Sequence, residues 1–156
     1  MHPMVNVAVR AARSAGNIIV RNIDRLDRIQ VDTKGLNDFV SDVDRMAEDE
    51  ICAILSQAYP DHAIVAEERG GEENAEYVWL IDPLDGTHNY LRGFPHYAIS
   101  IALKYRGALE AGVIYDPIRQ ELWTARRGGG CNFEGRRMRI EPRQSIDNAL
   151  IGTGFP

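Results

Sequence analysis

The chain has 156 residues, of which 44% are hydrophobic and 26% charged, as expected for a globular protein with one sizeable core. Its net charge of −5, from 18 basic and 23 acidic residues, argues against wholesale nucleic-acid binding. No apolar run is long enough to span a membrane, and the N-terminus lacks the regions of a signal peptide. We therefore expect a cytoplasmic protein without a membrane partner, whose Cys52 and Cys131 are free thiols.

Two helices are predicted in the first part of the chain. Apolar residues recur at helical spacing from Met4 to Ile23, and a second apolar stripe runs from Val43 to Ala58. Between them, residues 29–33 alternate like a short strand. Dense acids, including Asp44, precede the second stripe, and from the residues alone helix capping by Ser41 or Asp42 is the favoured interpretation.

Strands dominate the remainder. Residues 63–66 form a short apolar run that ends in Glu67 and Glu68, and residues 77–81 form an aromatic and β-branched strand. Segments 97–104, 109–115 and 121–125 are separated by turns and predict an antiparallel meander, and residues 149–152 predict one more strand. Helices followed by mostly antiparallel strands indicate an α+β fold, which we assign to a single domain over residues 1–156.

The stretch from Tyr77 to Asn89 carries the strongest chemical signal. Pro83 has no amide hydrogen, so strand pairing is predicted to stop there, and Gly86 permits a tight turn before a helix that begins near Thr87. Asp82 and Asp85 then lie close together and repel each other unless a cation lies between them. Mg²⁺ suits such carboxylates, and a helix N-terminus offers amides to phosphate. These are the components of metal-assisted phosphate ester hydrolysis, although such a turn can also be a plain polar connection.

Three acidic clusters, D-F-V-S-D-V-D at 38–44, A-E-E at 66–68 and W-L-I-D-P-L-D-G-T at 79–87, resemble the inositol monophosphatase family in order and spacing. The opening M-H-P-M-V-N-V-A-V-R-A-A-R, the V-I-Y-D-P at 113–117 and the closing G-T-G-F-P are similar to its bacterial branch. The resemblance implies the N-terminal part of a layered α/β sandwich, with two long helices and a largely antiparallel sheet. It also implies Mg²⁺-dependent hydrolysis of inositol-1-phosphate, inhibition by Li⁺ and a homodimer.

The resemblance assigns metal ligands to four positions. Glu67 matches a metal-binding glutamate, and Asp82 matches the carboxylate that bridges two Mg²⁺ ions. The carbonyl of Leu84 would ligate the first ion and Asp85 the second. A complete site of the family holds two or three Mg²⁺ ions.

The resemblance also assigns the catalytic residues Asp44, Glu67 and Thr87. Thr87 matches the threonine that orients the attacking water, and Asp44 matches its hydrogen-bonded aspartate. The amides of Gly86 and Thr87 would hold the substrate phosphate, and Lys34 lies near a basic residue often found at the edge of the site.

The sequence also departs from the family pattern. His88, Tyr90 and Ser41 replace a common threonine, phenylalanine and threonine, respectively, beside the expected ligands. Members of the family continue further and supply another metal aspartate in a W-D motif, together with residues that grip inositol. Neither feature is present, so we expect these 156 residues to be an N-terminal portion, truncated before the C-terminal portion, with weak phosphatase activity on its own.

Three alternatives stay open. A related phosphatase could act on another sugar or nucleotide phosphate. Haloacid-dehalogenase-type phosphatases carry D-x-D-G-T, whereas this chain reads D-x-x-D-G-T at 82–87 and lacks the β-α alternation that follows there. Some bacterial relatives are implicated in transcription antitermination and RNA-polymerase association, so a regulatory binding module is the third possibility. The arginine-rich edge between Arg126 and Arg143 would be its surface, although Glu134 and Glu141 interleave and favour a solvated face.

Overall fold

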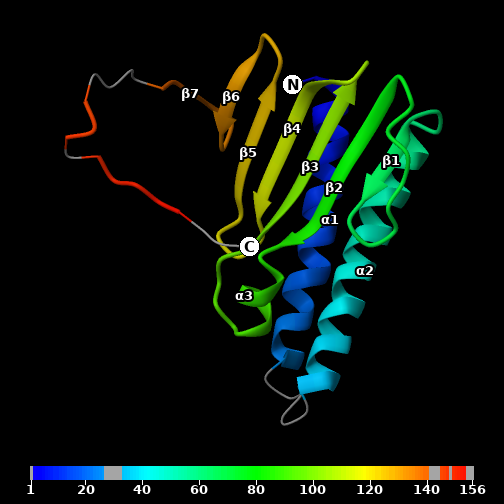
Figure 1. Ribbon diagram of the computed structural model, residues 1–156, viewed down its shortest axis with the longest axis vertical. Coiled ribbons are helices and arrows are strands. Elements are labelled where there is room, and N and C mark those ends of the chain that lie inside the picture. The colour runs from blue at the N-terminus through cyan, green and yellow to red at the C-terminus, as the bar shows by residue number, and fades with distance from the viewer. Residues whose placement is uncertain (1, 27–32, 141–144, 148, 154–156) are drawn as a thin grey trace.

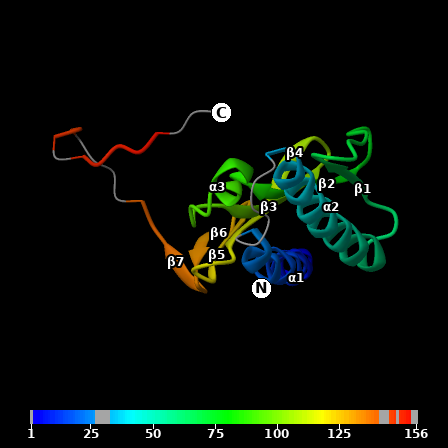
Figure 2. The same ribbon diagram turned by 90° about the horizontal axis from the view of Figure 1, so that it is seen from below.

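Two long helices cover one face of a seven-stranded sheet in the computed structural model (Figure 1). The structure describes residues 2–26, 33–140, 145–147 and 149–153, with the backbone alone for 26 and 33–41. Helix α1, Pro3–Leu26, packs on the middle of the sheet, and helix α2, Thr33–Ala58, packs beside α1 and nearer the sheet edge (Figure 2). In the described part of the chain, no helix is both long and apolar enough to cross a membrane.

The strands follow one another across the sheet in chain order, β1 to β7. β1 pairs with β2 in parallel, and every later pair is antiparallel. The strands are β1 Ala63–Ala66, β2 Tyr77–Asp85, β3 Ala98–Tyr105, β4 Ala108–Asp116, β5 Glu121–Arg126, β6 Gly130–Phe133 and β7 Arg136–Met138, and a short helix, α3 Thr87–Leu91, follows β2. The α+β prediction, with two long helices and a largely antiparallel sheet, is confirmed.

Small residues on α1 let the helix approach the sheet closely. The apolar stripe of α1 is mostly alanine, and Ala11, Ala12 and Ala15 have no exposed surface. A Cβ added at Gly16 would lie 2.8 Å from the ring of Tyr115 on β4, so only glycine fits there. The buried residues of β3 face these helices, whereas Ile114 on the other face of the sheet is 47% exposed. The core therefore lies between the helices and one face of the sheet.

Helix α2 begins earlier than predicted, at Thr33. Ser41 and Asp42 therefore lie inside the helix, and the prediction that they cap it is wrong. Asp42 instead pairs with Arg45 one turn later, at 2.8 Å. Leu36, Val40 and Val43 recur at helical spacing and extend the apolar stripe toward the N-terminus. The acidic residues between them made this part of the sequence resemble a helix cap. The short strand predicted at 29–33 lies outside the described residues except for Thr33, which belongs to α2.

Strand β2 also continues past Pro83, where its end was predicted. Asp82 pairs with Ser100 and Asp85 with Ala98, and the register shifts between them. This bulge places Pro83, which has no amide hydrogen to donate, in the interval without ladder pairing, so the strand can resume at Asp85.

The strand predicted at 149–152 is not observed. Residues 149–153 have no strand, and they run outside the sheet (Figure 1). Leu150 is 100% exposed and Ile151 is 77% exposed. An apolar run of this kind forms a strand only when a neighbouring strand pairs with it and buries it, and these residues have neither.

Asp116 stabilises the turn between β4 and β5, and its removal should be measurable. Its Oδ1 accepts hydrogen bonds from the amides of Ile118 and Arg119, both at 2.9 Å, and its Oδ2 accepts one from the Arg119 guanidinium at 2.7 Å. Burial raises the pKa of Asp116, but these hydrogen bonds outweigh burial and hold the pKa below its usual range.

We expect Asp116→Ala to lower the free energy of unfolding by about 2 kcal/mol at pH 7, since hydrogen bonds to a charged group are lost. Because the pKa is lower in the folded protein, this stabilisation is present above the unfolded pKa of about 4 and fades as the pH falls below it. Urea unfolding at pH 7 and pH 3 checks this. A difference between wild type and variant that is unchanged at pH 3 would contradict the role of the charge.

Candidate active site

Parallel pairing of β1 and β2 brings two predicted ligands to the same sheet edge. Ala66, the last residue of β1, pairs with Ile81, so Glu67 directly follows β1 and Asp82 is the next residue of β2. Parallel strands deliver their carboxyl ends to the same edge, and the two side chains interact closely enough for Glu67 to raise the pKa of Asp82. Glu67 is exposed at a tight turn in which Ala66 and Gly70 exchange backbone hydrogen bonds of 3.1 and 2.9 Å.

The connection from β2 to α3 is organised by its own hydrogen bonds. The amide of Leu84 donates to Oδ1 of Asp82 at 3.3 Å, and the Thr87 hydroxyl donates to the carbonyl of Leu84 at 2.9 Å. Gly86 adopts a left-handed conformation with φ of 96° immediately before α3. The turn therefore holds Asp82, Leu84 and Thr87 within one compact segment.

Negative charge accumulates around Asp44 and Asp82, where several carboxylates lie close together. Burial, followed by the neighbouring carboxylates of Glu67, Glu68, Asp82 and Glu48 in that order, raises the pKa of Asp44 to about 7. Burial, followed by Glu67 and Asp85, raises the pKa of Asp82 to about 6. Oδ1 of Asp44 is buried and accepts no hydrogen bond from the residues that the structure describes. Such an arrangement favours a bound cation or a proton.

The oxygen donors match the ligands that Mg²⁺ prefers. In the described part of the chain, however, no three His, Cys, Asp or Glu side chains converge closely enough to hold a metal ion. Glu67 and Asp85 are both exposed, and exposed side chains change rotamer readily. The types of donor and the concentration of negative charge therefore fit Mg²⁺. Bringing the ligands around one ion requires the side chains of Glu67 and Asp85 to change rotamer.

Thr87 and Asp44 are not hydrogen-bonded to each other, because the Thr87 hydroxyl donates to Leu84 instead. Asp44 lies on α2, is only 5% exposed, and senses the charges of Glu67 and Asp82. Their joint role stays a prediction. The side chain of Lys34 lies outside what the structure describes.

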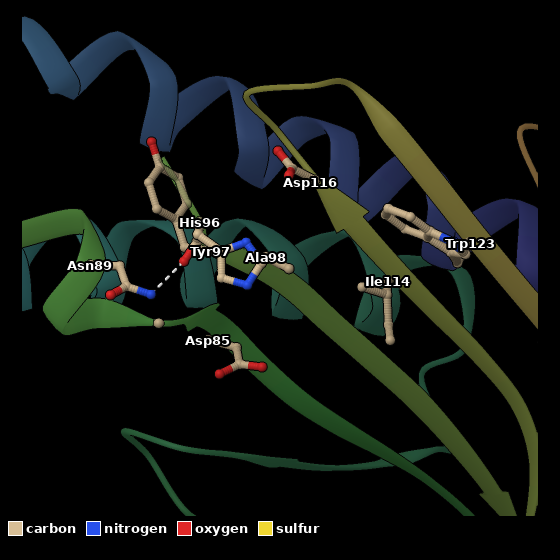
Figure 3. Close-up of a pocket in the computed structure, with 9 residues that line it drawn as sticks. Asp85, Asn89, His96, Tyr97, Ala98, Ile114, Asp116 and Trp123 are labelled. Carbon is tan, nitrogen blue, oxygen red and sulfur yellow. Dashed lines mark hydrogen bonds between the residues drawn. The ribbon is translucent and has the colours of Figure 1, made fainter. Parts of the chain in front are cut away.

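A cavity of about 410 Å³ adjoins this turn. It is lined by Asp85, Gly86, Asn89, His96, Tyr97, Ala98, Ile114, Asp116 and Trp123. In Figure 3 the side chain of Asn89 donates to the backbone carbonyl of His96, at 2.7 Å, and this bond ties α3 to the loop before β3. Sequence analysis missed the cavity, because residues from four strands, helix α3 and a loop meet there only after folding.

Sequence analysis also missed Glu48, a carboxylate that is 2% exposed. It lies one helical turn after Asp44 and accepts hydrogen bonds from the turn that carries Glu67. The available signal was its place on the apolar stripe of α2, where an acid is unusual unless it is paired.

Comparison with known proteins identifies the family of the chain. A model of the inositol monophosphatase family matches residues 1–156. This chain belongs to the inositol monophosphatase family. Its relatives in the family include the "Nus factor SuhB" of Pseudomonas aeruginosa, which is 55% identical over 160 residues. That alignment covers 100% of this chain but 59% of the relative, so the chain spans well under two thirds of the length of this relative.

Solved structures of the family superpose well on the chain. The extragenic suppressor protein suhB of Bartonella henselae aligns with a TM-score of 0.79 and 41% identity, covering 92% of this chain and 56% of that one. SaIMPase-II, solved with inositol monophosphate bound, aligns with a TM-score of 0.75 and 26% identity, covering 90% and 51%. Both likenesses confirm that the fold of this chain is that of the inositol monophosphatase family.

A substitution at Gly86 tests the turn. An added Cβ would lie 2.9 Å from the carbonyl oxygen of His96 and 3.1 Å from Cβ of Tyr97. The left-handed conformation alone costs a side-chain residue about 1–2 kcal/mol. We expect Gly86→Ala to lower the free energy of unfolding by about 2–4 kcal/mol, because the contact with His96 adds to that cost.

Gly93→Ala is the matched control, because Gly93 also has positive φ, 67°, but an added Cβ meets nothing within 4 Å. Its cost should be the conformational part alone, about 1 kcal/mol. Denaturant unfolding of both variants measures the difference. Equal losses would show that the contact with His96 contributes nothing.

Proposed function

We propose that this protein is a phosphatase that hydrolyses inositol-1-phosphate to inositol and phosphate in a Mg²⁺-dependent reaction. The observation that carries the proposal is the pair of Glu67 and Asp82 at the shared edge of β1 and β2, where burial and neighbouring carboxylates raise the pKa of Asp82. Membership of the family and the likeness to an inositol monophosphate complex support the choice of substrate.

Four donors would hold the metal: Glu67, Asp82, the Leu84 carbonyl and Asp85. The Leu84 carbonyl accepts one bond from Thr87 and keeps a second lone pair for a ligand. When bound, Mg²⁺ supplies Lewis acidity that activates water and stabilises the leaving oxygen. The donor chemistry supports this assignment. The family resemblance also implies that Li⁺ inhibits phosphate release.

The other residues of the turn would bind phosphate and direct the water. The amides of Gly86 and Thr87, at the beginning of α3, are donors for phosphate oxygens. Thr87 donates its hydroxyl proton to Leu84, so its oxygen is available to accept a hydrogen bond from the attacking water. Asp44 is buried beside Glu67 and Asp82 and has an unpartnered Oδ1, so it is placed to accept a hydrogen bond or a proton from that water.

The test is release of inorganic phosphate from inositol-1-phosphate, measured across Mg²⁺ concentrations and with added Li⁺. Glycerol phosphate and nucleoside monophosphates, which are phosphate esters of other alcohols, serve as comparison substrates. We expect Mg²⁺-dependent release with the highest kcat/KM for inositol-1-phosphate. A higher kcat/KM for a nucleotide or another sugar phosphate would redirect the substrate assignment, and release without Mg²⁺ would contradict the metal assignment.

A second function is favoured by the names of the relatives, several of which are Nus factors. We propose that the protein also associates with RNA polymerase or antitermination factors, through exposed arginines at the end of the sheet. Within the described chain, Arg136 and Arg137 on β7 are exposed and neither forms a salt bridge. Co-purification with RNA polymerase that survives Asp82→Asn but is lost in Arg136→Ala/Arg137→Ala would support it. Sedimentation would test the homodimer that the family resemblance predicts.

A further inference from the structure

Glu48 is a buried carboxylate to which the reaction proposed above assigns no role. It lies on α2 and is 2% exposed. Burying a charged carboxylate is costly unless it is paired and hydrogen-bonded, so its partners identify what it does. Those partners lie 20 and 21 residues away in sequence, in the turn after β1.

Two hydrogen bonds connect Glu48 to this turn. Its Oε2 accepts the backbone amide of Glu68 at 2.9 Å, and its Oε1 accepts Nε of Arg69 at 3.1 Å. Arg69 also pairs with Asp49, the next residue of α2. The turn is thus fastened to the helix at the two residues that directly follow Glu67.

The other side of Glu67 is fixed as well. Ala66 belongs to β1, and its amide and carbonyl both bond to Gly70. Glu67 therefore lies between a residue held by the sheet and a residue held by α2. Because its own side chain is exposed, the direction of that side chain depends on how firmly this short backbone segment is held.

We propose that Glu48 is a positioning residue that holds the backbone of the Glu67–Arg69 turn, and thereby keeps the Glu67 carboxylate beside Asp82 for metal binding. The inference rests on the proposed metal-dependent function. Residues that orient metal ligands typically change metal affinity by about 10- to 100-fold when they are removed. Glu48 itself contacts neither substrate nor the reacting atoms in this scheme.

Calorimetric titration of the full chain with Mg²⁺ tests the inference through binding alone. We expect Glu48→Ala to weaken Mg²⁺ binding by about tenfold or more. Glu48→Gln should stay within about threefold of wild type, because its amide oxygen still accepts the Glu68 amide. Glu50→Ala is the matched control: it removes the same charge from the same helix, where Glu50 accepts a hydrogen bond from Ser14 at 2.6 Å. It should bind like wild type.

Arg69→Ala distinguishes the effect of turn positioning on Mg²⁺ affinity from the effect of charge. It also replaces Glu48→Ala as the test if that variant does not fold. The Arg69 side chain is 50% exposed, so its removal leaves no cavity in the core. Loss of a positive charge near the site would by itself tighten Mg²⁺ binding. Loss of positioning should weaken it, and we expect about threefold weaker binding. Arg106→Ala, which removes an exposed arginine paired with Glu76 at the other end of β2, is the control.

Two results would overturn the inference. The first is wild-type Mg²⁺ affinity in both Glu48→Ala and Arg69→Ala. The second is an equal loss of Mg²⁺ affinity in Glu48→Gln and Glu48→Ala, which would show an effect of charge and not of position. If folded wild type itself binds no Mg²⁺, the proposed metal-dependent function fails and this inference falls with it. Hydrogen exchange of the Glu68 amide adds a metal-free measurement, which should be faster in Glu48→Ala than in wild type or Glu48→Gln.

Discussion

Asp82→Asn is expected to reduce Mg²⁺-dependent phosphate release on the order of 10²-fold or more, since several kcal/mol of charge stabilisation would depend on the metal that Asp82 helps to hold. Asn has nearly the same shape, and its oxygen still accepts the Leu84 amide that Asp82 holds at 3.3 Å. It also relieves the repulsion from Glu67 and Asp85. The unfolding temperature of the variant should therefore equal or exceed that of the metal-free wild type.

The measurement is phosphate release at saturating Mg²⁺, with thermal unfolding recorded on the same preparations. Asp61→Asn is a suitable control, because Asp61 is an exposed aspartate in the connection between α2 and β1. It makes the same chemical change away from the β2–α3 turn and should leave release unchanged. Activity near wild type in Asp82→Asn would show that this carboxylate does not hold the metal.

Thr87→Ala and Asp44→Asn are each expected to slow turnover about 10²-fold, which is typical for the loss of a group that positions or deprotonates the attacking water. If both groups act on the same water, the double variant should be hardly slower than either single variant. The two side chains share no hydrogen bond in the structure, so a shared role depends on the water between them.

A double-mutant cycle on kcat measures this coupling. Ser14→Ala provides a control for the loss of a hydroxyl, because Ser14 bonds to Glu50 between α1 and α2 and contributes nothing to the proposed reaction. Independent losses that multiply to about 10⁴-fold would show that Thr87 and Asp44 act separately. In that case the contribution of Asp44 would have to be sought in its interaction with Glu67 and Asp82.

The sequence predicted the backbone around the proposed metal site where the information was local, and the metal ligands themselves stay a prediction. Asp82, Gly86 and Thr87 lie within six residues, and a strand followed by a glycine turn and a helix could be recognised from residue types. The same local reasoning misplaced the beginning of α2, because acids that resemble a cap can equally well occupy the exposed face of a helix that continues. It also ended β2 too early, because a bulge that tolerates Pro83 depends on the partner strand.

The sequence by itself determined the two long helices and the order of strands β1 to β5, because hydrophobic period, turn residues and short motifs are properties of neighbouring residues. It did not predict β6 and β7, and it predicted a strand at 149–152 that these residues do not form. Only the tertiary structure decided which distant residues meet. Parallel pairing of β1 with β2 places Glu67 beside Asp82, and packing of α2 brings Glu48 to the Glu68 amide. The cavity at Asp85 likewise joins residues as far along the chain as Trp123. Strand register and helix packing depend on burial across the whole fold, and no local pattern in the sequence contains that information.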